Sequence, residues 1–225
     1  MSNAESERLR ALYSYETALY AGGCRLVVGV DEVGRGAVAG PVSAGACILG
    51  PDADPTAIPY LNDSKKLTPR RRESAASAIK EHALAWHVAH VPADVIDATG
   101  IVAALQQAMR AAVSGLAGQL TGAYAGTDPL LQTVLLDGRP MGLFEREQAI
   151  VKGDGKVAAI AAASVLAKVE RDALMCDYDV RYPGYGFADH KGYAAAAHVD
   201  NIVRRGLSEI HRKSFCGNFF QGKLF

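Results

Sequence analysis

Short apolar runs in the first two thirds of the chain predict a sheet. CRLVVGVDE (24–32) and PVSAGACIL (41–49), joined by a glycine-rich turn, predict two antiparallel strands. AWHVAHVP (85–92) and TVLLDGRP (133–140) predict two more strands, and AIVKGDGK (149–156) predicts a short one that runs into a helix. Strands that alternate with helical patterns indicate an α/β protein.

Helical spacing fills much of the remaining sequence. Residues 92–120 have helical periodicity with an interruption at Gly100, and an alanine-rich helix is predicted over roughly 156–179. A last helix, YAAAAHVDNIVRRG, ends on Gly206, a residue typical of a helix C-terminus. No internal repeat or long linker divides the chain. The expected parts are one domain over 1–225, with an N-terminal helical extension at 1–22 and a C-terminal tail at 216–225.

Composition is that of a globular protein with reduced thiols. Apolar residues make up 49% of the 225 residues, enough to bury a core without a disulfide or a zinc site. The four cysteines form no C-x-x-C pair, as expected for a cytosolic protein. The charged N-terminus has no signal-peptide core, and the longest apolar run, IAAASVLA (160–167), is shorter than the ~20 residues of a membrane span. We therefore expect a cytoplasmic protein with no membrane partner.

Charge is balanced over the whole sequence but uneven along it. The 24 basic and 24 acidic residues give a formal net charge of zero, without the global basic character typical of a nucleic-acid-binding protein. Residues 62–73, NDSKKLTPRRRE, are locally basic, as are the neighbourhoods of Lys152, Arg204 and Arg212. Each cluster alone is typical of a solvated surface. Basic clusters combined with an acidic centre are less easily explained in this way.

Two adjacent carboxylates, Asp31 and Glu32, directly follow the apolar run LVVGV. Like charges held close together destabilise a protein unless a cation, a proton or an arginine neutralises them. Neighbouring residues of a strand point to opposite faces, so both acids can serve one site only if the strand ends or twists there. Gly34 and Gly36 provide the expected break.

Asp137 and Asp154 stand at further expected strand ends, in LLDG and KGDGK. Taken alone, Asp137 is typical of a turn and Asp154 of a helix N-cap. Strand ends of a mostly parallel sheet meet at one edge, so we expect the acids to converge. Oxygen ligands without histidine or cysteine favour Mg²⁺ or Mn²⁺ over zinc. The expected metal ligands are Asp31, Glu32, Asp137 and Asp154.

Six motifs resemble those of a known family. They are GVDEVGRGAVAGPV, NDSKKL, LLDG, KGDGK followed by IAAASVLAKVERD, YPGYGF-x-x-HKGY and IHRKSF. In order and spacing they are similar to the motifs of the type 2 ribonucleases H, specifically bacterial ribonuclease HII, from about Cys24 to Phe215. The resemblance implies an α/β, ribonuclease H-like fold: a mixed five-stranded sheet flanked by helices, with a helical C-terminal part.

The same resemblance implies a metal-dependent endoribonuclease of ribonucleotide excision repair. Its substrates would be RNA–DNA hybrids and single ribonucleotides embedded in duplex DNA, cut on the 5′ side to leave a 3′-hydroxyl and a 5′-phosphate. The four carboxylates would hold two Mg²⁺ or Mn²⁺ ions, an arrangement suited to phosphodiester hydrolysis. We expect the protein to be a monomer.

The turn after the acids is expected to recognise ribose. Gly34 and Gly36 flank Arg35 and, lacking Cβ atoms, let backbone groups approach a sugar closely. A tight turn between two strands is the alternative explanation. By resemblance to the family, the backbone of Gly34, Arg35 and Gly36 contacts the ribose 2′-hydroxyl. Tyr193 of HKGY would pack on the neighbouring deoxyribose at the RNA–DNA junction.

Three side chains are expected to bind phosphates beside the cut. Lys65 lies in NDSKKL, and Ser164 and Lys168 are spaced i and i+4 on one helix face. An ordinary surface lysine is the alternative for Lys168. Arg171 and Asp172 are expected to form a structural ion pair rather than a fifth metal site.

The chain ends in QGKLF (221–225). Large apolar side chains at a terminus are usually poorly buried, so this tail either packs on the enzyme or binds a partner. It resembles the Q-x-x-L-F peptide by which bacterial repair enzymes bind the DNA polymerase sliding clamp. Leu224 and Phe225 would fill an apolar pocket, and Gln221 would bond at its rim.

Two other classes of function stay open. One is another carboxylate-dependent nuclease of similar fold, such as a resolvase or an exonuclease. An exonuclease needs a free end, so cleavage of a closed circle with one embedded ribonucleotide would distinguish the two activities. The other is a catalytically silent hybrid-binding module, which would bind without turnover in Mg²⁺. The motifs also contain His190 and His211, to which spacing alone assigns no role.

Overall fold

The sheet of this protein is mixed and has β1 at its centre. The computed structural model describes residues 3–54 and 56–220, and its five strands run in the order β3-β2-β1-β4-β5. β1 pairs antiparallel with β2 and parallel with β4; β2 pairs antiparallel with β3, and β4 pairs parallel with β5. The strands are β1 (Val27–Val33), β2 (Val42–Ile48), β3 (Ala85–Val91), β4 (Thr133–Asp137) and β5 (Arg146–Ile150).

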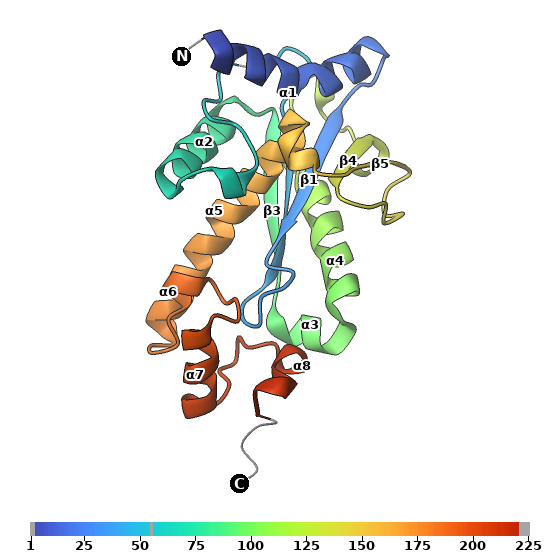
Figure 1. Cartoon of the computed structure of the whole chain (residues 1–225). Helices are drawn as coiled ribbons and strands as arrows, with labels where there is room; N and C mark the ends of the chain where they lie inside the picture. The colour runs from blue at the N-terminus through green and yellow to red at the C-terminus, as the bar shows by residue number, and fades with distance from the viewer. Residues whose placement is uncertain (1–2, 55, 221–225) are drawn as a thin grey trace.

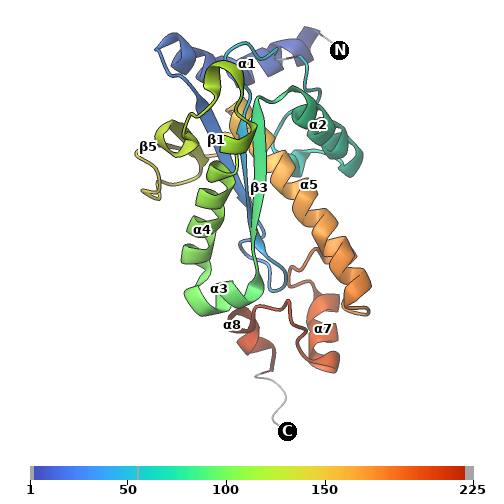
Figure 2. The same ribbon diagram turned by 180° about the vertical axis from the view of Figure 1, so that it is seen from behind.

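Helices cover both faces of the sheet, with α4 on one side and α5 on the other (Figures 1 and 2). Val28 and Val30 of β1 belong to the buried apolar cluster on the α4 side. On the opposite face, a Cβ on Gly29 would lie 2.1 Å from the Ala159 carbonyl carbon, so glycine lets α5 pack directly on β1. The helices are α1 (Asn3–Ala21), α2 (Pro69–His82), α3 (Ala93–Thr99), α4 (Ile101–Ser114), α5 (Ala158–Arg181), α6 (Phe187–His190), α7 (Ala196–Arg205) and α8 (Lys213–Cys216).

Most predicted elements are found with shifts of a few residues. Gly100 separates α3 from α4, and α7 ends at Gly206 with a φ of 83°, both as predicted. The strand predicted over residues 149–156 is displaced, because it overlaps β5 only at residues 149 and 150. β5 ends earlier, and a single 3₁₀ turn, η5 (Gly153–Gly155), follows it, because Lys152 adopts a left-handed φ of 57° and redirects the chain.

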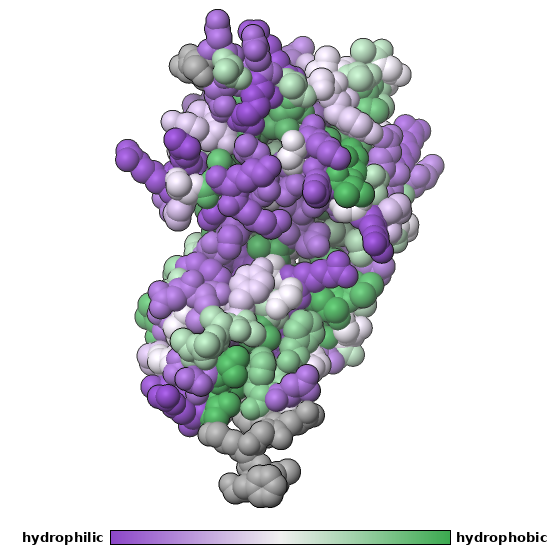
Figure 3. Space-filling view, viewed as in Figure 1, coloured by the Kyte–Doolittle hydropathy of each residue, from purple (hydrophilic) through white to green (hydrophobic). Residues whose placement is uncertain are grey.

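The surface is divided between polar and apolar regions. Figure 3 shows hydrophilic residues over the upper half of one face and more apolar residues toward the C-terminal helices. In the part of the chain that the structure describes, no helix is both long and apolar enough to cross a membrane. All four cysteines are free thiols, two of them buried.

Candidate active site

Three aspartates from different elements meet at one edge of the sheet. Asp31 of β1, Asp137 at the end of β4 and Asp154 in η5 each place a carboxylate oxygen within 4.8 Å of the other two. Asp31 and Asp154 are buried, and Asp137 is half-buried. β1 and β4 are parallel neighbours with Val30 opposite Leu136, so their C-terminal ends coincide. Three of the four acids predicted to converge therefore lie together.

Glu32 lies beside this group, on the other face of β1. The strand continues past both acids to Val33, and Glu32 still pairs with β2, so the predicted break at Gly34 and Gly36 follows the two acids and does not turn them to one face. Alternation places Asp31 on the α5 side and Glu32 on the α4 side. There Glu32 and Asp137 line a cavity of about 400 Å³, with Glu32 Oε1 3.9 Å from the Arg35 guanidinium.

Burial and mutual repulsion favour the protonated forms of these acids. Burial, with the charges of Glu32 and Asp137, raises the pKa of Asp31 to about 7, although a hydrogen bond from Ser164 lowers it. Burial likewise raises the pKa values of Glu32 and Asp154. Such a group is stabilised by a bound cation. Oxygen donors without nitrogen or sulfur fit a hard divalent ion such as Mg²⁺ or Mn²⁺.

Backbone donors hold two of the carboxylates in place. The Gly153 N–H donates to Asp137 Oδ1 at 2.6 Å, and the Glu32 N–H donates to Asp31 Oδ1 at 2.7 Å. Asp154 is not the N-cap of α5, because that position is occupied by Val157, which makes no side-chain cap bond. The carboxylate of Asp154 is therefore directed to the acidic group and not to the helix.

The predicted phosphate-binding residues are in different situations. The Lys65 side chain is 79% exposed, and its Nζ lies 3.8 Å from Asp154 Oδ2. Ser164 is buried and bonds to the Ser64 hydroxyl at 3.0 Å, a contact that the sequence did not indicate. Lys168 donates to Asp172 at 2.8 Å, so a carboxylate already neutralises its charge.

The predicted ion pair between Arg171 and Asp172 is wrong. Asp172 pairs with Lys168 and lies 3.8 Å from Arg72. Successive residues of a helix point about 100° apart, so Arg171 enters the interior while Asp172 stays near the surface. Fully buried Arg171 donates to the carbonyl oxygens of Ala39, Pro41 and Lys191.

A second buried arginine, Arg212, shapes the turn after the acids. It donates to the carbonyl oxygens of Gly34 at 2.7 Å and Arg35 at 3.0 Å, and also to that of Gly40 at 3.0 Å. Burial lowers its pKa to about 10. The sequence analysis missed this residue, and its only signal was a place in the motif IHRKSF. All three of these bonds go to backbone carbonyls, so the Arg212 donors fix the backbone of the turn.

Comparison with known proteins identifies the family. Residues 28–218 match the model of the protein family described as Ribonuclease HII. The chain belongs to the ribonuclease HII family. It is 46% identical over 212 residues to ribonuclease HII of Mycobacterium avium, covering 94% of this chain and 86% of that protein. Identity to the Mycolicibacterium paratuberculosis enzyme is also 46%, covering 94% and 82% of the two chains.

Solved structures confirm the ribonuclease HII fold. The ribonuclease H2 of Pyrococcus horikoshii OT3 superposes with a TM-score of 0.69 at 23% identity, over 87% of this chain and 97% of that one. The RNase HII in the PCNA complex of Archaeoglobus fulgidus gives a TM-score of 0.65 at 23% identity, over 84% and 94%. Members of the ribonuclease HII family are metal-dependent endoribonucleases that act on RNA–DNA hybrids, and this protein is one of them.

In this ribonuclease HII, Tyr193 lies on a loop that is bonded to the chain just after the glycine-rich turn. The Gly192 carbonyl accepts bonds from the Val38 and Ala39 N–H groups at 2.8 and 3.1 Å. Tyr193 is 39% exposed, and the Arg171 guanidinium lies 5.7 Å from the centroid of its ring. The tyrosine predicted to contact DNA is thus held next to the turn predicted to contact ribose.

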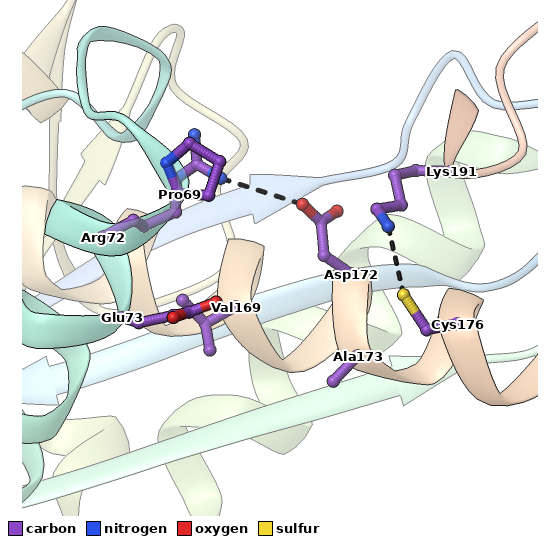
Figure 4. Close-up of a pocket in the computed structure, with 8 residues that line it drawn as sticks. All are labelled: Pro69, Arg72, Glu73, Val169, Asp172, Ala173, Cys176 and Lys191. Carbon is purple, nitrogen blue, oxygen red and sulfur yellow. Dashed lines mark hydrogen bonds and ion pairs between the residues drawn. The ribbon is translucent and has the colours of Figure 1, made fainter. Parts of the chain in front are cut away.

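A separate cavity of about 270 Å³ lies between α2 and α5 (Figure 4). Arg72 and Asp172 face each other across it, and Lys191 Nζ lies 3.1 Å from the exposed Cys176 thiol. None of the three clustered aspartates lines this cavity. It therefore stands apart from the candidate active site of the ribonuclease HII.

Proposed function

We propose that this ribonuclease HII cuts on the 5′ side of a ribonucleotide and leaves a 3′-hydroxyl and a 5′-phosphate. The substrates are RNA–DNA hybrids and duplex DNA with single embedded ribonucleotides. The observation that carries the proposal is the convergence of Asp31, Asp137 and Asp154, whose oxygens lie within 4.8 Å of one another. Glu32 on the opposite face of β1 would complete a set of four carboxylates.

The donor set fits two divalent ions, Mg²⁺ or Mn²⁺, held by Asp31, Glu32, Asp137 and Asp154. Asp137 links the two parts of the set, since its carboxylate lies with those of Asp31 and Asp154 and it also lines the cavity with Glu32. Bound ions of this kind lower the pKa of a water and stabilise charge on the leaving 3′-oxygen. The chain itself contributes the fixed positions of the carboxylates, because Gly153 and Glu32 donate backbone bonds to them.

The backbone of Gly34, Arg35 and Gly36 would distinguish ribose from deoxyribose through the 2′-hydroxyl. Arg212 occupies the carbonyl oxygens of Gly34 and Arg35, whereas the N–H groups of Arg35 and Gly36 donate to no residue in the described part of the chain. A Cβ on Gly36 would meet nothing within 4 Å, so packing within the protein does not require glycine there. A sugar that approaches the backbone closely would explain the glycine at this position.

Tyr193 and Lys65 would bind the strand on either side of the cut ribonucleotide. The half-exposed Tyr193 ring offers an apolar face for the neighbouring deoxyribose. Lys65 is exposed beside Asp154 and can contact a phosphate as a point charge. Ser164 would act by its bond to Asp31, and Lys168 would have to leave Asp172 before it could bind a phosphate.

Cleavage of a labelled DNA duplex with one ribonucleotide tests the proposal. With Mg²⁺ or Mn²⁺ we expect a single cut 5′ to the ribonucleotide, and no cut when a chelator is present. A closed circle carrying one ribonucleotide should also be nicked. Cleavage only from free ends, or binding without cleavage, would refute the proposal in favour of an exonuclease or a silent binding module.

We also propose that the tail binds the DNA polymerase sliding clamp through Gln221, Leu224 and Phe225. These residues lie outside the described part of the chain, so the support comes from the sequence QGKLF. One structural relative, from Archaeoglobus fulgidus, has been solved as a complex of RNase HII with PCNA. Packing of the tail on the enzyme itself is the alternative.

A further inference from the structure

A carboxylate from α1 bonds to the first turn of α5. Glu16 is only 4% exposed, and its Oε1 accepts the Ala159 N–H at 2.6 Å. The two residues are 143 positions apart in the sequence. Helix α1 also lies outside residues 28–218, the part that matches the family.

Helix α5 has no side-chain cap of its own. The first N–H groups of a helix lack intrahelical acceptors and need another partner. The N-cap residue, Val157, is fully buried in an apolar cluster with Val27, Leu135 and Ile160 and makes no side-chain cap bond. Glu16 of α1 therefore supplies the side-chain hydrogen-bond acceptor that the residues before α5 do not provide.

The first turn of α5 also determines where the aspartates lie. Ala159 packs directly against Gly29, two residues before Asp31 on the same strand. On its N-terminal side, α5 is preceded by η5, which contains Asp154 and the Gly153 N–H that donates to Asp137. A displacement of this turn would change the separation of all three carboxylates.

Helix α1 is held firmly enough to fix Glu16. Leu9 is fully buried, and Arg8 donates to the Leu61 carbonyl at 2.9 Å. At the other end of the helix, the Tyr20 hydroxyl accepts the Val27 N–H at 3.3 Å. Figures 1 and 2 both show α1 lying across one end of the molecule, over the start of α5.

A buried carboxylate is an unfavourable choice if only packing matters. Glu16 Oε2 is buried without a hydrogen-bond partner among the described residues, and desolvation of such a group destabilises the fold. Burial raises the pKa of Glu16 to about 7. An apolar side chain would fill this position without the desolvation penalty of a carboxylate, but it could not accept a hydrogen bond from the Ala159 N–H.

We propose that Glu16 is a positioning residue for the metal site, acting through the first turn of α5. The inference rests on the proposed function, because it assigns to Glu16 an effect on the geometry of Asp31, Asp137 and Asp154. Residues that orient metal ligands typically change metal affinity by about tenfold or more when they are removed.

The test is Mn²⁺ binding to the full-length protein without substrate, measured from the electron paramagnetic resonance signal of free Mn²⁺. We expect Glu16→Ala to weaken binding about tenfold and Glu16→Gln to keep most of the affinity, since the amide oxygen accepts the same N–H. Hydrogen exchange at Ala159 and its neighbours should accelerate in Glu16→Ala only. The exposed Glu7 on the same helix is the matched control, and Glu7→Ala should change neither measurement.

Leu116→Ala separates positioning from general stability. It removes a fully buried side chain from the apolar cluster on the α4 side of the sheet, away from α1 and α5. The inference is overturned if Leu116→Ala weakens Mn²⁺ binding as much as Glu16→Ala does, or if Glu16→Ala changes neither affinity nor exchange. A failure of the proposed function would differ, because wild-type protein would then neither bind Mn²⁺ nor cleave. In that case, hydrogen exchange at Ala159 would still test whether Glu16 stabilises the first turn of α5.

Discussion

At the residue scale, ionising the buried aspartates costs the protein stability. The pKa of Asp31 is raised by burial to about 7, and those of Glu32 and Asp154 are raised in the same direction. When the pKa of a carboxyl is higher in the folded chain than in the unfolded chain, the folded protein becomes less stable as pH rises from about 4 to about 7. A bound divalent ion offsets this cost, so metal and protons compete for the site.

We expect Asp31→Asn to abolish cleavage and to stabilise the metal-free protein at pH 8. The free energy of unfolding should increase by on the order of 1 kcal/mol or more, since one pKa unit corresponds to about 1.4 kcal/mol. Urea unfolding in the presence of a chelator measures this. Added Mg²⁺ should stabilise the wild type but much less the variant. Wild-type turnover by Asp31→Asn would remove this residue from the site.

Gly36→Ala should leave stability unchanged and reduce cleavage strongly. The reason is that its Cβ would meet no protein atom within 4 Å but would enter the space expected for the ribose. Both hybrids and lone ribonucleotides carry the 2′-hydroxyl, so both rates should fall.

Tyr193→Ala should instead reduce cleavage at a lone ribonucleotide more than in a continuous RNA strand. Rates on the two substrates, measured side by side, check this; equal losses for Tyr193→Ala would contradict its junction role.

At the element scale, buried histidines join the C-terminal segments to the Tyr193 loop. His198 Nδ1 bonds to the Tyr193 carbonyl at 2.8 Å, and its Nε2 lies 3.1 Å from His211 Nε2. His211 Nδ1 accepts the Ser208 N–H at 2.9 Å and lies 2.7 Å from the Ser208 hydroxyl, so each imidazole donates through one ring nitrogen and accepts through the other. The His198–His211 bond and the bond from the Ser208 N–H require neutral rings, because a protonated ring nitrogen cannot accept.

Acid should therefore destabilise the C-terminal segments. Burial lowers the pKa values of His198 and His211 to about 4, so their contribution is complete above about 6.5 and is lost as pH falls through 4. Urea unfolding between pH 7.5 and 4 should show a loss on the order of 1–3 kcal/mol from these two groups. His198→Asn should flatten that slope. An unchanged slope in the variant would show that other groups control acid stability.

At the scale of the whole molecule, a net charge of zero means that binding of nucleic acid depends on where the cations lie. Lys65 is exposed and lies beside Asp154, where it can contact a phosphate. We expect Lys65→Ala to weaken binding and to reduce the slope of log K against log salt by about one. Lys80, paired with Glu170 on the surface, is the matched control. Equal slopes for Lys65→Ala and the wild type would exclude a phosphate contact.

Deleting residues 221–225 tests the tail. We expect unchanged cleavage of a short oligonucleotide and loss of binding to the sliding clamp in a calorimetric titration, because the tail lies beyond the catalytic motifs. A weak interaction is expected, since a short segment must become ordered on binding. A truncated protein with lower stability or basal activity would show instead that the tail packs on the enzyme.

The sequence by itself determined most of the strands, the helices α4, α5 and α7, and the acids at the strand ends. These features depend on local patterns: the apolar runs around Asp31 and Asp137, the break at Gly100 and the helix end at Gly206. Alternation along a strand is likewise local, so the opposite placement of Asp31 and Glu32 could be foreseen once the strand was known to continue. Motif order was enough to indicate the family.

Only the tertiary structure decided which partners the buried charges take. Arg171 bonds to backbone carbonyls and not to the adjacent Asp172, and Arg212 bonds to carbonyls 177 and 178 residues away. Glu16 bonds to the helix that follows Asp154, across 143 residues. Backbone groups carry no sequence signal, because every residue has them. The packing of whole helices and strands therefore decides which carbonyl or N–H a buried side chain reaches. The pattern of side chains along the sequence does not contain this information.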